Sequence, residues 1–89
     1  MQHLNIQIKG RVQGVFYRAS AVKEAERLNL KGFARNERDN SVYIEAEGDE
    51  TNLQSFLKWC AKGPPMAIVS EVKTEVGDWK GFTKFEIGY

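Results

Sequence analysis

Two short segments of this sequence carry side chains suited to phosphate chemistry. The first is GRVQGVFYR, residues 10–18, in which two glycines precede Arg18 at the expected start of a helix. Glycine permits a backbone curl with inward-pointing N–H groups, and the free N–H groups of a helix start attract anions. The planar guanidinium of Arg18 would add donors that match phosphate oxygens. The segment therefore fits an anion site, and the alternative is an ordinary turn with Arg18 in solvent.

Asn36 is the second candidate for chemistry. It closes the segment GFARN, residues 32–36, at the end of an expected strand, although asparagine is depleted in strands. Its amide oxygen can accept a hydrogen bond from a water molecule and so hold it in place. The alternative is that Asn36 merely begins the turn that follows. The residues alone leave both interpretations open.

The remaining reactive residue types favour structural roles. His3 lacks a second histidine, cysteine or close carboxylate that would indicate a metal site, and Cys60 continues the apolar stripe of a helix. Trp59 and Trp79 are expected to cover the edges of the core. The carboxylates expected in turns, at helix caps or on solvent-facing surfaces are Asp39, Glu45, Glu47, Asp49 and Glu50. GRVQG is neither a Walker loop nor G-x-G-x-x-G, so nucleotide binding has no support.

The size and charge of the chain limit the classes of protein to consider. The 89 residues suffice for one domain, residues 1–89, and the net charge of +1 gives no field that would recruit nucleic acid or membrane. One cysteine allows no internal disulfide, which favours a reducing compartment. The first ten residues lack the pattern of a signal peptide, and no apolar run is long enough to span a bilayer. A cytoplasmic protein is expected.

The order of the expected elements predicts the fold class. The elements are a strand at 3–9, a helix to about residue 30 that Gly32 ends, strands at 33–37 and 42–47, a helix capped by Asp49 and stopped at 63–65, a strand at 68–76, and a short strand at 85–89. The alternating strands predict one sheet face under both helices and the other in water. This βαββαβ order predicts an α+β, ferredoxin-like sandwich with a mainly antiparallel sheet and an extra C-terminal strand.

Two longer motifs resemble one known family. IKGRVQGVFYR, residues 8–18, closely resembles the acylphosphatase signature, and GFARNERDNSVYIEAEG, residues 32–48, resembles the second signature of that family. GPP and GFTKFEI resemble its later segments, so the resemblance covers essentially the whole chain. Tyr17 stands where the signature usually has phenylalanine, and Asn40 replaces the usual turn glycine. These departures affect loop geometry and leave the proposed chemistry intact.

The resemblance implies a small hydrolase that cleaves the carboxyl–phosphate bond of acyl phosphates without metal or cofactor. It implies that Arg18 binds the phosphoryl group together with loop amides, and that Asn36 positions the attacking water. The loop amides would come from Gln13, Gly14, Val15, Phe16, Tyr17 and Arg18. Inorganic phosphate is expected as product or competitive ligand. A monomer with no nucleic-acid or membrane partner is expected.

Two other functions fit the same fold class. KGFA, residues 31–34, copies the opening of the RNA-recognition motif, but Arg35 and Asn36 break that motif, which would also lie on the wrong strand. Salt-sensitive RNA binding would revive this alternative. The other is a phosphate-sensing or carbamoyl-phosphate-handling domain. Such domains are often attached to larger enzymes, so a free-standing chain favours the independent hydrolase.

Overall fold

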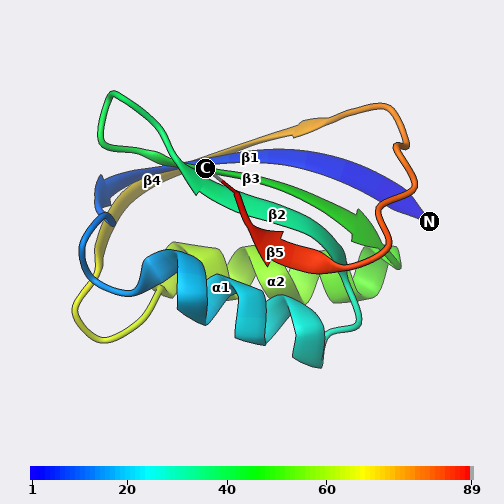
Figure 1. Ribbon diagram of the computed structural model, residues 1–89, viewed down its shortest axis with the longest axis horizontal. Helices are drawn as coiled ribbons and strands as arrows, with labels where there is room; N and C mark the ends of the chain where they lie inside the picture. Colours follow the sequence, from blue (N-terminus) through cyan, green and yellow to red (C-terminus); the bar gives the residue numbers. More distant parts are fainter. Residues whose placement is uncertain (89) are drawn as a thin grey trace.

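Two helices lie side by side against one face of a five-stranded sheet in the computed structural model, which describes residues 1–88 (Figure 1). In chain order the elements are β1 (Gln2–Arg11), α1 (Tyr17–Arg27), β2 (Lys31–Asn36), β3 (Val42–Gly48), α2 (Glu50–Lys62), β4 (Ile68–Val76) and β5 (Phe85–Ile87). The strand order is β4-β1-β3-β2-β5, and only β5 runs parallel to its neighbour, β2. The predicted α+β ferredoxin-like fold is confirmed.

The core lies between the helices and the central strands. Leu4, Ile6 and Ile8 of β1 are buried, and Ile6 pairs with Ile44 of β3. The helices contribute Ala21, Ala25, Leu53, Phe56 and Cys60 to the same cluster. Because alternate residues of a strand face opposite sides, this register turns the polar residues of β1 to the outer face.

The end of α1 differs from the prediction. The helix stops at Arg27, and Asn29 makes the turn in the left-handed conformation, with φ 57°. Gly32, expected to end the helix, lies inside β2 instead, with φ 150°. A Cβ there would lie 1.8 Å from the carbonyl oxygen of Glu45, so glycine is needed for the close approach of β2 to β3. Asp49 directly precedes α2, but its side chain makes no capping hydrogen bond.

The outer face of the sheet is partly covered, contrary to expectation. The segment from 77 to 84, which joins β4 to β5, crosses this face, and the backbone N–H groups of Lys80 and Phe82 donate to the carboxylate of Glu47. His3, Glu45 and Glu47 are therefore buried, with 2%, 6% and 1% exposure. The prediction that both glutamates face solvent was wrong, because strand alternation cannot reveal a loop that folds back over the sheet.

The two tryptophans differ in their surroundings. The ring of Trp59 stacks on Phe56 and lies 5.3 Å from the ring of Tyr17, so Trp59 covers a core edge as predicted. Trp79, expected in a similar role, is 54% exposed. Phe85 and Ile87 lie in β5 as predicted, whereas Tyr89 falls outside the described residues. No helix within residues 1–88 has the length and apolar character needed to cross a membrane.

Candidate active site

The loop between β1 and α1 is built from unusual backbone conformations. Gly14 and Phe16 both adopt positive φ, 73° and 65°. Val12 and Val15 are buried and anchor the loop in the core. Left-handed residues in a short loop can turn successive N–H groups toward one side, and such a concavity binds anions. The first turn of α1 carries no acidic residue that would oppose an anion there.

A break in the strand register leads the chain into this loop. The pairing of β1 with β4 shifts between Lys9 and Gly10, and Gly10 has φ 132°. A Cβ on Gly10 would lie 2.2 Å from the carbonyl oxygen of Ile68, so the bulge requires glycine. The first glycine of the motif therefore serves strand packing, and Gly14 is the one within the loop.

Gln13 ties the loop to the turn between β2 and β3. Its Nε2 donates hydrogen bonds of 2.9 Å to two carbonyl oxygens, those of Glu37 and Ser41. Both segments lie at the same end of the molecule (Figure 1). Since Asn36 directly precedes Glu37, the Gln13 side chain couples the loop before Arg18 to the strand end that carries Asn36. The family resemblance implied a role for the backbone amide of Gln13 and gave no signal for this side-chain role.

Arg18 and Asn36 line one pocket of about 250 Å³. Its other lining residues are Val12, Gly14, Phe16, Tyr17, Ala19 and Ile87. Of the predicted loop residues, Gln13 and Val15 do not line it, because Gln13 reaches the neighbouring turn and Val15 is buried. Ile87 was not predicted as a site residue; its only signal was its place in the alternating pattern of the last strand. Among the described residues that line the pocket, none is His, Cys, Asp or Glu.

Tyr17, which lines the pocket, connects the two helices through Cys60. The hydroxyl of Tyr17 donates a 2.7 Å hydrogen bond to the carbonyl oxygen of Cys60, and both residues are buried. Burial raises the pKa of the Tyr17 phenol and raises the pKa of the Cys60 thiol to about 12. Cys60 is therefore a packed thiol and a poor nucleophile. The tyrosine in place of phenylalanine is accommodated because its hydroxyl has an acceptor.

The pocket brings the guanidinium-bearing Arg18 and the amide-bearing Asn36 together, and none of its described lining residues is a strong side-chain base. Within residues 1–88, no three His, Cys, Asp or Glu side chains are grouped so that they could hold a metal ion.

Comparison with known proteins identifies the family. The family model for acylphosphatases matches residues 4–87. The chain belongs to the acylphosphatase family. The acylphosphatase of Thermotoga petrophila is 44% identical over 89 residues, which cover 100% of this chain and 99% of that protein. The acylphosphatase of Methylococcus capsulatus is 41% identical over 88 residues, covering 98% and 96% of the two chains.

Solved structures that are similar to this chain have the same architecture. The acylphosphatase crystal structure from Bacillus subtilis superposes with a TM-score of 0.97 at 36% identity and covers 100% of both chains. Full-length HypF, in a phosphate- and nucleotide-bound form, is similar with a TM-score of 0.89 and 28% identity. That match covers 99% of this chain and 12% of HypF, so the acylphosphatase fold is also found within a much longer protein.

Proposed function

We propose that this protein hydrolyses acyl phosphates to a carboxylate and inorganic phosphate. In this proposal the loop amides of residues 13–18 and the guanidinium of Arg18 hold the phosphoryl group, and Asn36 positions the attacking water. The observation that supports it best is the shared pocket, in which the glycine loop and Arg18 meet Asn36 from a separate strand. Family membership supports the reaction type.

The demands of the reaction match what the pocket offers. The leaving group is a carboxylate, which departs without an acid to protonate it. The enzyme must therefore align the water with the phosphorus and stabilise charge on the phosphoryl oxygens. Preorganised N–H donors and an arginine stabilise the phosphoryl charge at little reorganisation cost. Asn36 aligns the water by accepting a hydrogen bond from it.

The proton of the attacking water needs an acceptor. The amide of Asn36 is not a base, and no described lining residue is a carboxylate or histidine. We assign the role to a phosphoryl oxygen of the substrate. The water oxygen then bonds to phosphorus, and the bond from phosphorus to the acyl oxygen breaks with its electrons leaving on the carboxylate. The proton ends on the released phosphate.

Hydrolysis of benzoyl phosphate by the purified protein tests this function. The assay contains a metal chelator, and a phosphomonoester such as 4-nitrophenyl phosphate is measured in parallel. We expect rapid hydrolysis of the acyl phosphate, sparing of the monoester, and competitive inhibition by inorganic phosphate. A folded sample that binds phosphate but leaves benzoyl phosphate intact would contradict the enzymatic function and favour a phosphate sensor.

A further inference from the structure

Phenylalanine is an unusual residue type at the position of Phe16. It lies directly before α1 at the N-cap, where Ser, Thr, Asp, Asn and Gly are preferred, and its side chain makes no capping bond. Its φ of 65° is left-handed, a conformation that suits glycine or asparagine and is unusual for an aromatic residue. Phe16 is also 79% exposed, so it contributes little to the core.

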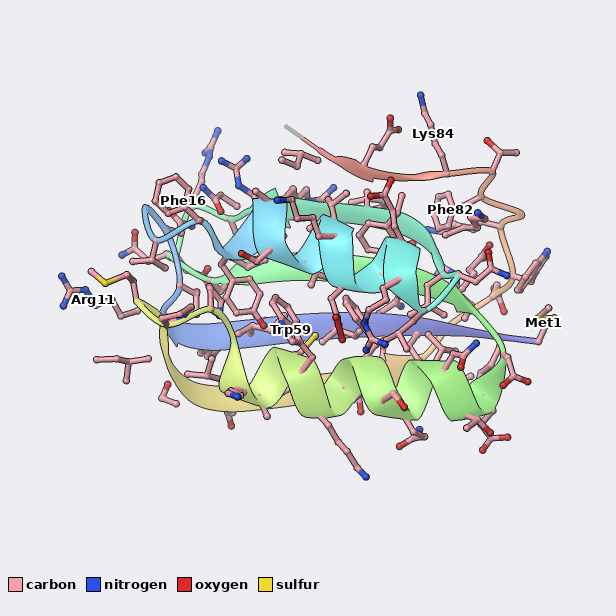
Figure 2. The ribbon with its side chains drawn as sticks, turned by 90° about the horizontal axis from the view of Figure 1, so that it is seen from below. Met1, Arg11, Phe16, Trp59, Phe82 and Lys84 are labelled. Atoms are coloured by element: carbon pink, nitrogen blue, oxygen red, sulfur yellow. The ribbon has the colours of Figure 1, made fainter. Side chains whose placement is uncertain are left out.

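The ring of Phe16 stands at the pocket that holds the candidate chemistry. Phe16 lines this pocket together with Arg18 and Asn36. Figure 2 places it at the end of the molecule where the β1–α1 loop lies, away from Met1 and Phe82. Residues in rarely populated backbone conformations are concentrated at functional sites, where ligand binding and not fold stability explains them.

An apolar surface beside a phosphate cradle suits one part of the substrate. The polar lining of the pocket includes Arg18 and Asn36. Two large apolar residues also line it, Phe16 in the β1–α1 loop and Ile87 in β5. In an in-line displacement the acyl group leaves opposite the attacking water. The acyl group therefore leaves on the side of the phosphoryl group opposite the water that Asn36 holds. Phe16 lies at the same pocket, in the loop before α1 and outside the strand that carries Asn36.

We infer that Phe16 is a specificity-determining residue that contacts the acyl group and favours acyl phosphates with an aromatic or bulky apolar acyl part. This inference rests on the proposed function and adds the substrate class to it. An exposed aromatic ring can stack on a flat acyl group such as benzoyl, and it offers much less contact to acetyl. The contact is made in both the bound substrate and the transition state, so it acts mainly on KM.

The test compares kcat/KM for benzoyl phosphate with kcat/KM for acetyl phosphate in the same enzyme. Phe16→Gly and Phe16→Asn remove the ring, keep the backbone N–H and tolerate the left-handed conformation. Phe16→Tyr keeps the ring. Trp79→Ala is the matched control, because it removes another exposed aromatic from the segment between β4 and β5, outside the pocket.

We expect the benzoyl-to-acetyl ratio to fall about tenfold in Phe16→Gly and Phe16→Asn, mostly through a higher KM for benzoyl phosphate. The ratio should be kept in Phe16→Tyr and Trp79→Ala. A distorted loop would lower kcat/KM for both substrates together and leave their ratio unchanged. An unchanged ratio in active variants therefore overturns the inference about Phe16 and leaves the proposed function standing. If the folded wild-type protein hydrolyses neither substrate, the proposed function fails and the inference fails with it.

Discussion

At the scale of single residues, the proposed role of Asn36 is to hold the attacking water and not to contact the phosphoryl group. We therefore expect Asn36→Ala to lower kcat by about 10²–10³-fold, the usual effect of removing one positioned polar group. The inhibition constant of inorganic phosphate should stay within about twofold of wild type, because the loop amides and Arg18 remain. Asn52→Ala on α2 is the matched control. An equal loss of phosphate binding in folded Asn36→Ala would contradict the assigned role.

Arg18 is expected to act on binding and turnover together. Lysine at this position keeps the charge but lacks the planar pair of donors that fits two phosphate oxygens. Arg18→Lys should raise the inhibition constant of phosphate and lower kcat, each by about tenfold or more. Arg27→Lys makes the same exchange on the exposed part of α1, where Arg27 pairs with Glu24, and should leave both parameters unchanged. Wild-type kinetics for Arg18→Lys would refute the role of Arg18.

At the scale of elements, the site depends on how the β1–α1 loop is held against the β2–β3 turn. Gln13→Glu keeps the shape of the side chain but loses the donor, and its carboxylate would face the carbonyl oxygens of Glu37 and Ser41. Removing these bonds should cost about 1–3 kcal/mol of unfolding free energy and at least tenfold in kcat. Chemical denaturation and steady-state kinetics measure the two effects. Gln54→Glu on the exposed surface of α2 is the control. Equal unfolding free energy and equal kcat in the two variants would contradict the coupling of the β1–α1 loop to the β2–β3 turn.

At the scale of the whole molecule, a buried polar cluster fastens the 77–84 segment over the outer sheet face. Burial pushes the pKa of Glu47 upward, but the N–H groups of Lys80, His3 and Phe82 more than offset this and hold it below its usual value. The pKa of Glu45 is also held below its usual value. Burial raises this pKa, but the hydrogen bonds donated by Lys80 and Tyr43 more than offset the effect of burial. A carboxyl with a lowered pKa stabilises the fold above its unfolded pKa, and this stability is lost as the pH falls through the folded pKa.

The free energy of unfolding should therefore decrease as the pH falls below about 4.5, the ordinary pKa of glutamate. Glu47→Gln should lose about 3 kcal/mol at pH 7, because His3 and the backbone donors would lose their charged partner. Its stability should then depend less on pH in the acid range. Glu86→Gln is the control, since its pair with Lys84 is largely exposed, and it should change stability by less than about 0.5 kcal/mol. Equal curves for Glu47→Gln and wild type would contradict this account.

The sequence predicted what local patterns encode and missed what the tertiary contacts decide. Alternation at Leu4, Ile6 and Ile8 predicts a half-buried strand, and the structure confirms it. His3 is buried against Phe82 of the distant 77–84 segment, and the Gln13 side chain reaches carbonyl oxygens of the β2–β3 turn. Neither contact could be inferred from neighbours in the chain. The family motifs pointed to Arg18 and Asn36, and their catalytic roles stay a prediction.

In the proposed reaction, a water in the pocket attacks the phosphorus of an acyl phosphate. Hydrolysis of benzoyl phosphate in water enriched with oxygen-18, followed by mass spectrometry of both products, tests it most directly. If water attacks the phosphorus, the label enters inorganic phosphate and benzoate stays unlabelled. Label in benzoate would mean attack at the carbonyl carbon, which would contradict the roles proposed for the loop, Arg18 and Asn36.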